Sequence, residues 1–558
     1  MTNKKNSIIK ICFTFLIISQ LVAVQSASAL GEDETTADYK EKIMNTSKAL
    51  GISVYEDFPV EFAGEDVSKS KGIIYSDYSM FGEMRDIPIP DLPKQVQPAE
   101  EEEPKIFTDK VSYWGYAKSL YYMLKAKIED SGILPWREGV PSFEESSKEV
   151  LSMVKKSRFA PRKLGQSSLL RNEGFLKEME SLSGAKFTNG NTTKFLINGP
   201  ESFGMKDSLI KGAKKSIYIG SYSIHDDMTG FETADMLIAK KEEGVAVKVI
   251  VDYKVAGTTG KAIKRLEEAG VEIIRHMDAK RTGDYWHVKM LIVDDKYAII
   301  GGMNYADWYS HKNPDGPKWR DTDVLYTGLS VLETKKIFAG IWNAIVEEKK
   351  LPFKNINMNV HHNNSAGGSA RVAVMYQNPP SENPAILLSI VKAIYGATER
   401  INIENPYYVA VPAITQAVLD ARARGVEVNI LTNSKKSIDA EAKAMADIII
   451  KGLMPLVSAG VKVYLKKGET LHSKFMTVDG VYCNIGSYNF HPRSERYDTE
   501  MNVSIIDPAS VKQLDSVFEE DIAKAIKINT LEDLEYEPGW LAKIVEKYFY
   551  AELSQKKK

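Results

Sequence analysis

A motif that occurs twice constrains this chain more than any other feature. The first copy is His287-Val288-Lys289, with four residues between the lysine and Asp294. The second copy is His472-Ser473-Lys474, with the same gap before Asp479, and the two copies start 185 residues apart. A spacing kept over so long a distance indicates an internal duplication with a period far above that of solenoid repeats. The chain is therefore expected to contain two similar halves.

The segments around the motif repeat as well. Asn304 and Asn489 each follow their histidine by seventeen residues. Gly244-Val245-Ala246-Val247 corresponds to Gly425-Val426-Glu427-Val428, and in both halves short apolar stretches alternate with helical patterns. Strands that alternate with helices predict crossover connections and a covered sheet. We therefore predict an α/β fold of two pseudo-symmetric sandwich halves, packed with both HxK motifs at their interface.

Composition shifts divide the rest of the chain. A helix is predicted from Ser142 to Val154, where Ser142 and Glu145 form a capping box. The sequence before the first half indicates no function of its own. The predicted organisation is a signal peptide (1–29), a partly helical N-terminal extension (30–190), the first half (191–350), a polar linker (351–369), the second half (370–530) and a C-terminal helix (531–558).

The N-terminus has the pattern of a secretory signal. Lys4, Lys5 and Lys10 precede or begin an apolar run from Ile11 to Val24, and Ala27-Ser28-Ala29 is a small-residue cleavage site. We expect an exported protein, periplasmic or secreted, that is soluble or associates peripherally with a membrane. An uncleaved membrane anchor is the alternative, although the run is shorter than the roughly 20 residues a spanning helix needs.

Charge and cysteine content narrow the function classes. The formal net charge is −2, so no global basic field favours nucleic acid as a partner. Of the two cysteines, Cys12 lies in the signal, and only Cys483 follows it. The mature chain can therefore form neither an intrachain disulfide nor a cysteine metal cluster.

The doubled motif suits chemistry on a phosphodiester. Side chains alternate along a strand, so a histidine and a lysine two residues apart lie on the same face. If the halves pack at their motifs, His287 can attack phosphorus while His472 protonates the leaving oxygen. The lysines already supply positive charge, so neither a metal nor a cofactor is expected. The side chains expected to stabilise the phosphoryl oxygens are Lys289, Lys474, Asn304 and Asn489.

An attacking histidine also needs an acid on its other ring nitrogen. Asp323, in a Trp-Arg-Asp-Thr-Asp segment, and Glu500, in an Arg-Tyr-Asp-Thr-Glu segment, are the candidates. Asp294 and Asp479 complete the motif and count among the catalytic candidates. Their place between two predicted strands nevertheless favours a role in fixing a turn.

These motifs resemble those of the phospholipase D superfamily over residues 192 to 530. Gly486-Ser487-Tyr488-Asn489-Phe490, followed by Thr499-Glu500-Met501, resembles bacterial cardiolipin synthases, as does Gly301-Gly302-Met303-Asn304. The resemblance implies a phosphohistidine intermediate, a phospholipid substrate at a membrane surface, and transfer of a phosphatidyl group to water or to an alcohol. If phosphatidylglycerol is the acceptor, the product is cardiolipin.

Two other functions are open on the sequence. A metal-independent nuclease of the same superfamily would need a basic groove lined with aromatic residues, which the net charge does not support. A binding protein with a degenerate site is disfavoured because both motifs are intact. His491 and Asp498 replace residues common in cardiolipin synthases, so the acceptor is open, as is the oligomeric state.

Overall fold

The computed structural model describes residues 143–258, 260–276, 284–358, 367–378, 384–409, 411–440 and 442–538. The predicted signal peptide, most of the N-terminal extension and the apolar stripe of the predicted C-terminal helix lie outside these residues. Within the described ranges, no helix is both long and apolar enough to cross a membrane.

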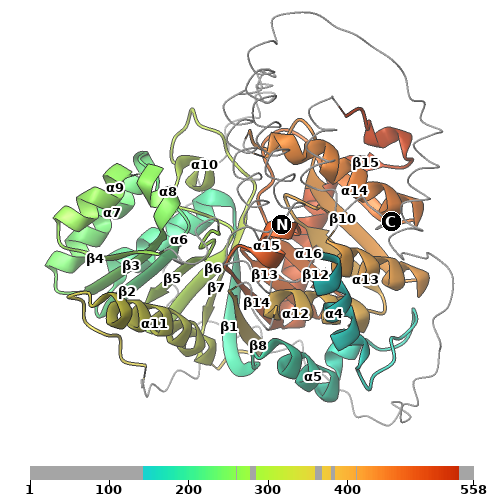
Figure 1. The fold of residues 1–558 in the computed structure, drawn as a ribbon, viewed down its shortest axis with the longest axis horizontal. Helices are drawn as coiled ribbons and strands as arrows, with labels where there is room; N and C mark the ends of the chain where they lie inside the picture. Colours follow the sequence, from blue (N-terminus) through green and yellow to red (C-terminus); the bar gives the residue numbers. More distant parts are fainter. Residues whose placement is uncertain are drawn as a thin grey trace, which may run out of the picture. The chain divides into compact units, whose positions relative to one another are not determined.

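The strands of both halves form one mixed sheet of fifteen strands, shown in Figure 1. In each half three neighbouring strands are parallel and the others antiparallel. In sheet order the strands are β15 (Ile526–Ile528), β11 (Lys462–Lys466), β10 (Glu427–Asn433), β9 (Arg400–Glu404), β12 (Phe475–Val478), β13 (Tyr482–Gly486), β14 (Glu500–Ile506), β8 (Ala370–Gln377), β1 (Thr188–Ile197), β7 (Thr322–Thr327), β6 (Tyr297–Gly301), β5 (Lys289–Val293), β2 (Ser216–Ser221), β3 (Ala246–Asp252) and β4 (Glu272–His276).

The strand order is mirrored about the centre of the sheet. Reading outward from β1 and from β8, the same sequence of pairings occurs in both halves, which confirms the predicted duplication. The halves join where β1 pairs antiparallel with β8, at Thr188 with Val372 and at Asn191 with Ala370. The second half has an extra edge strand, β15, in which Ile526 pairs with Leu465 of β11.

Helices cover both faces of the sheet in each half (Figure 1). In the first half, α6, α7, α8 and α9 pack on one face and α11 on the other. In the second half, α12, α13 and α14 lie opposite α16. The helices are α6 (Asn198–Gly212), α7 (Met228–Glu242), α8 (Tyr253–Thr258), α9 (Gly260–Glu268), α10 (Asp307–Ser310), α11 (Leu329–Lys349), α12 (Ala385–Gly396), α13 (Pro412–Ala423), α14 (Ala446–Ser458), α15 (Pro492–Arg496) and α16 (Pro508–Ala523), with 3₁₀ turns at Lys443–Met445 and Glu532–Leu534.

A single hydrophobic core connects the two halves. Phe338 and Trp342 of α11 share this core with Phe475 of β12 and Phe518 of α16, and all four side chains are buried. Strands β6 and β7 also contact β13 and β14. Burial of aromatic side chains from both halves fixes the halves against each other, because each such residue contributes a few kcal/mol, about 1.5–3, when removed from water. This packing determines how the two motifs meet.

The described part of the N-terminal extension packs on the second half. It contains α4 (Phe143–Lys155), a 3₁₀ turn (Leu169–Arg171) and α5 (Glu173–Ser183). Both helices contact α12, whose residues are apolar almost all round and are all buried. A helix that is hydrophobic on every side must be covered on every side. The extension therefore completes the core of the second half.

Candidate active site

The first motif is held by the second half of the chain. His287 lies two residues before Lys289, which begins β5, so the motif leads into the strand rather than lying within it. Trp286 forms a parallel bridge with Thr499, and the backbone N–H of His287 donates to the carbonyl of Thr499 at 2.9 Å. This backbone bond fixes the histidine at the boundary of the halves.

The second motif is held by the first half in the same way. Leu471 forms a parallel bridge with Arg320, and the backbone N–H of His472 donates to the carbonyl of Arg320 at 2.7 Å. The Arg320 side chain also crosses the boundary, since its guanidinium lies 2.7 Å from Asp521 and 3.3 Å from Glu404. Each motif is thus clamped by the half that does not contain it.

The acids that orient the imidazoles also come from the opposite halves. Nδ1 of His287 lies 2.9 Å from Oε2 of Glu500, the predicted partner. Nδ1 of His472 lies 2.7 Å from Oδ2 of Asp321. The prediction that Asp323 orients a histidine is therefore wrong, and Asp321 occupies that position. In each half Nδ1 is bound, which leaves Nε2 as the nitrogen available for chemistry.

Strand register explains the error. Gly301 pairs with Asp323 in the first half, whereas its counterpart Gly486 pairs with Asn502 in the second. Asp323 is therefore equivalent to Asn502, and Asp321, two residues earlier, to Glu500. The Asp-Thr-Asp and Asp-Thr-Glu segments match in sequence with an offset of two residues from the structural alignment. The match between the acidic segments therefore indicated Asp323, and only the strand pairing identifies Asp321.

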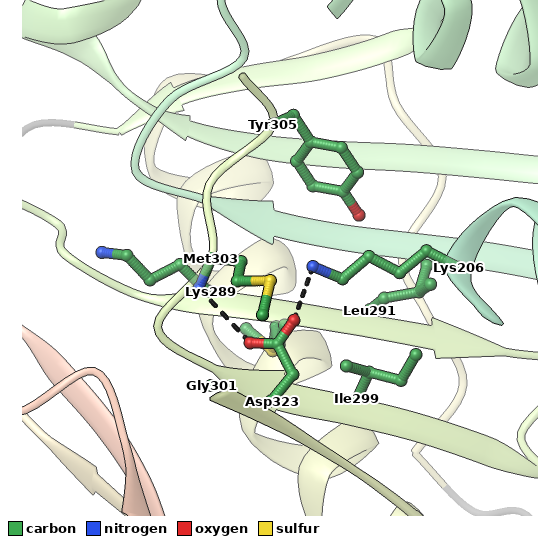
Figure 2. A pocket seen from close by; sticks show the side chains of 9 residues that line it. Lys206, Lys289, Leu291, Ile299, Gly301, Met303, Tyr305 and Asp323 are labelled. Carbon is green, nitrogen blue, oxygen red and sulfur yellow. Dashed lines mark hydrogen bonds and ion pairs between the residues drawn. The ribbon is translucent and has the colours of Figure 1, made fainter. Parts of the chain in front are cut away.

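Asp323 lies beneath the first motif in a buried ion pair (Figure 2). One carboxylate oxygen lies 2.8 Å from Nζ of Lys206 and accepts from Ser202 at 2.5 Å. The other accepts the backbone N–H of Met303 at 3.3 Å. Asp323 therefore supports the turn that leads to Asn304, and has a structural role behind the site.

The two lysines lie beside their own histidines. Nζ of Lys289 donates to the carbonyl of His287 at 2.8 Å. Nζ of Lys474 donates to the carbonyl of His472 and lies 3.1 and 3.3 Å from Nδ1 and Nε2 of that imidazole. The charge of each lysine acts on both imidazoles, so the two lysines and the two histidines share one site. A phosphate bound there would face two cations and two ring nitrogens.

The chain is similar to known proteins over both halves. The family model described as cardiolipin synthase, PLD-like domain, matches residues 207–315 and 390–522. Cardiolipin synthase A of Pseudomonas syringae is 30% identical over 381 residues, which cover 65% of this chain and 76% of the relative. The chain belongs to the phospholipase D family. It is a phospholipase D-like enzyme of the cardiolipin synthase type.

Two further similarities extend over much of the chain. A cardiolipin synthase of Listeria welshimeri is 25% identical over 417 residues, covering 73% of this chain and 84% of the relative. Phosphatidylserine synthase of Haemophilus influenzae superposes with a TM-score of 0.53 at 16% identity, covering 68% of this chain and 98% of that one. The structural similarity establishes the shared phospholipase D fold.

Burial sets the protonation of the histidines in this phospholipase D-like site. Desolvation lowers the pKa of His287 and of His472 well below the usual value, and the charges of Lys289 and Lys474 lower it further. A neutral imidazole that donates Nδ1–H to a carboxylate keeps a lone pair on Nε2, as a nucleophile requires. Burial also lowers the pKa of Lys474 to about 8.

Two serine hydroxyls, in addition to His287, bind the side chain of Glu500. Burial raises the pKa of Glu500 to about 8, while the charge of Lys289 and two serine hydroxyl bonds oppose that rise. These hydroxyls belong to Ser487 and Ser494, each 2.5 Å from the carboxylate. Ser487 lies in the Gly486–Phe490 segment named above, but a contact of either serine with Glu500 was not predicted, because it depends on which side chains the fold brings together.

The two asparagines lie at the site, but their settings differ. Nδ2 of Asn304 donates to the hydroxyl of Tyr309 at 3.1 Å, and this hydroxyl lies 3.4 Å from Nε2 of His472. The backbone N–H of Asn489 donates to Ser494 at 3.2 Å. Both asparagine side chains are buried, and within the described residues neither Oδ1 has a hydrogen-bond partner. These groups are available to bind a substrate.

Asp294 and Asp479 lie away from the imidazoles, at the turns that follow β5 and β12. Asp294 accepts the backbone N–H groups of Lys214, Lys215 and Ser216 at 2.7–2.9 Å. Asp479 accepts those of residues 398–400 at 2.8–3.0 Å. Both aspartates have positive φ, 54° and 52°, which Asp tolerates better than most residues. Their place among the catalytic candidates is therefore corrected to a structural role in each turn.

Proposed function

We propose that the protein is a phosphatidyltransferase that acts through a phosphohistidine, with cardiolipin synthesis as its specific reaction. One observation carries the proposal: two imidazoles, each bound through Nδ1 to a carboxylate of the opposite half, share a buried site with two lysines. Such a site has the groups needed to bind a phosphodiester, attack phosphorus and transfer a proton.

His287 suits the role of nucleophile better than His472. Its side chain is 13% exposed against 6% for His472. Nε2 of His472 also lies beside the Tyr309 hydroxyl, a group that can stand in for a leaving or an attacking oxygen. We therefore assign His287 as nucleophile and His472 as general acid and base.

The reaction then proceeds in two displacements. His472 enters the first step with a proton on Nε2. The lone pair on Nε2 of His287 forms a bond to phosphorus, the bond from phosphorus to the leaving alcohol breaks, and His472 gives its Nε2 proton to the leaving oxygen. In the second, the acceptor hydroxyl gives its proton to His472, its oxygen bonds to phosphorus, and the electron pair of the N–P bond returns to His287. Lys289 and Lys474 stabilise the charge on the phosphoryl oxygens.

The substrate assignment rests on the relatives. The relatives from Pseudomonas syringae and Listeria welshimeri are cardiolipin synthases, which supports phosphatidylglycerol both as donor and as acceptor. We also propose that the enzyme works outside the cytoplasm at a membrane surface, on the strength of the basic, apolar and small-residue pattern in residues 1–29.

The test is an assay of the full-length protein with three substrates in the presence of a chelator. Vesicles of phosphatidylglycerol labelled in the phosphate should give labelled cardiolipin and free glycerol. Labelled phosphatidic acid would show that water is the acceptor instead, and phosphatidylethanolamine tests the headgroup. Cleavage of single-stranded DNA without lipid turnover would overturn the proposal in favour of the nuclease.

Histidine variants test the mechanism in the same assay. His287→Ala and His472→Ala should each lower turnover by about 10²-fold or more, as expected for loss of a nucleophile or a general acid. Acid-labile, alkali-stable label should accumulate on the protein when His287 is present. Retention of label by His287→Ala and its loss in His472→Ala would reverse the assignment of the two roles.

A further inference from the structure

The helix α4 of the N-terminal extension reaches the catalytic machinery. It precedes the residues matched by the family model, which begin at 207. The hydroxyl of Ser146, in α4, donates to Oε1 of Glu495, in α15, at 2.8 Å, although 349 residues separate them. Glu495 is 5% exposed. A bond between a buried carboxylate and a helix so distant in sequence fixes one element relative to the other.

The short helix α15 carries the residue that holds the orienting acid. Ser494 immediately precedes Glu495 in the chain, and its hydroxyl donates to Oε1 of Glu500 at 2.5 Å. Oε2 of the same carboxylate binds Nδ1 of His287 at 2.9 Å. Three hydrogen bonds and one peptide bond thus lead from Ser146 to the imidazole of His287.

α15 depends on its neighbours for its position. It has only five residues, and a helix of this length has little stability of its own in water. The strand β8 supports it on one side, where Nε2 of Gln377 donates to the carbonyl of Ser494 at 3.1 Å. Ser146 supports it from α4.

α4 is fixed on the second half by apolar packing. Val150 and Val154 of α4 are buried, and the helix packs against α12 and α13. Below it, Lys392 of α12 lies 2.8 Å from Glu178 of α5 and donates to the hydroxyl of Ser157, just after α4, at 2.7 Å. The apolar contacts and this ion pair hold the extension to the second half, so Ser146 can act as a fixed support.

We propose that α4 positions the nucleophile, with Ser146 and Glu495 as positioning residues that act through α15 and Glu500 on His287. The N-terminal extension then contributes to catalysis through the second half, on which it packs. This inference rests on the proposed function, since it assigns a role in the same reaction.

Five single variants of the full-length protein and one double variant test the inference. Ser146→Ala removes the hydroxyl, and Ser146→Thr retains one. Ser152→Ala is the matched control, since Ser152 lies exposed on the same helix. Glu495→Gln retains an oxygen that accepts from Ser146, whereas Glu495→Leu does not. For each variant, kcat and KM for phosphatidylglycerol vesicles and the melting temperature are measured.

The loss of one partly buried hydrogen bond predicts that Ser146→Ala lowers kcat by about 3- to 10-fold, with KM and melting temperature close to those of the wild type. Ser146→Thr and Glu495→Gln should keep most of the activity. The double variant with Ser146→Ala and Glu495→Leu should be no slower than Glu495→Leu alone, because both substitutions remove the same hydrogen bond.

The inference is overturned if Ser146→Ala turns over like Ser152→Ala, if Ser146→Thr fails to restore kcat, or if the two losses multiply in the double variant. A change in KM or melting temperature without a change in kcat would likewise show a structural role only. Absence of lipid turnover by the wild-type protein would instead contradict the proposed function, so the two failures are distinguishable.

Discussion

Glu500 binds Nδ1 of His287 at 2.9 Å across the boundary between the two halves, with 213 residues between them. Asp321 and His472 make the reciprocal contact at 2.7 Å. Neither half contains a complete histidine–acid pair from its own residues. Each half therefore depends on the other for an oriented imidazole, and activity requires that both are folded and packed together.

Asp321 and Glu500, which bind the two imidazoles, should affect kcat far more than Asp323 does. Asp321→Asn and Glu500→Gln should each lower kcat by about 10- to 100-fold with little change in KM, because each replaces the carboxyl group that binds and orients Nδ1 of an imidazole by an amide, which is a weaker acceptor. Steady-state kinetics on phosphatidylglycerol vesicles measures this. Equal kcat for Asp321→Asn and wild type would show that the carboxylate contributes no orientation.

The buried Lys206–Asp323 pair should contribute to stability in a way that depends on both partners (Figure 2). Lys206→Met leaves the Asp323 carboxylate buried without its cation, at a cost of about 3–5 kcal/mol in the free energy of unfolding. The double variant with Asp323→Asn should recover most of it, because the equivalent Asn502 functions in a neutral setting, where Nδ2 donates to Asn484 at 2.7 Å. Chemical denaturation of the single and double variants tests this, and additive losses would contradict it.

Asp294 and Asp479 should affect folding and leave chemistry intact. Asp294→Ala removes the acceptor for three backbone N–H groups, one of them partly buried, which should cost about 1–3 kcal/mol in the free energy of unfolding. The rate per folded molecule should match the wild type, as measured by active-site labelling with the phosphorylated intermediate. Asp479→Ala should behave alike, and a fall in kcat per labelled site would return these residues to the catalytic set.

Activity should decline as the pH rises above about 8. The pKa of Lys474 lies at about 8 because of burial, so its protonated fraction falls as the pH passes through that value. Burial also lowers the pKa of Lys289 well below its usual value. Only protonated ammonium groups stabilise the phosphoryl oxygens, so kcat/KM should decrease by at least about tenfold per pH unit once the pH exceeds the pKa of Lys474. The pH profile of kcat/KM on a soluble phosphodiester measures it. A profile that stays flat to pH 10 would show that Lys474 is charged throughout.

Most of the fold followed from the sequence because duplication and periodicity are local properties. The predicted alternation of strands and helices is present in both halves, and the predicted helix Ser142–Val154 matches α4 within one residue at each end. The apolar runs that predict these elements are the same runs that the core buries. The pairing of β1 with β8 could not be predicted in this way, because it depends on how the two halves approach each other.

The sequence by itself determined the family, the reaction class and, through the doubled motif, four of the groups at the centre of the site: His287, Lys289, His472 and Lys474. A separate acidic segment indicated Glu500. The tertiary structure decided which acid faces which imidazole, that Asp321 and not Asp323 binds His472, and that α4 supports α15. The physical reason is that residue types and spacings record local chemistry. Contacts across hundreds of residues depend on strand register and on packing between the halves, which only the folded chain specifies.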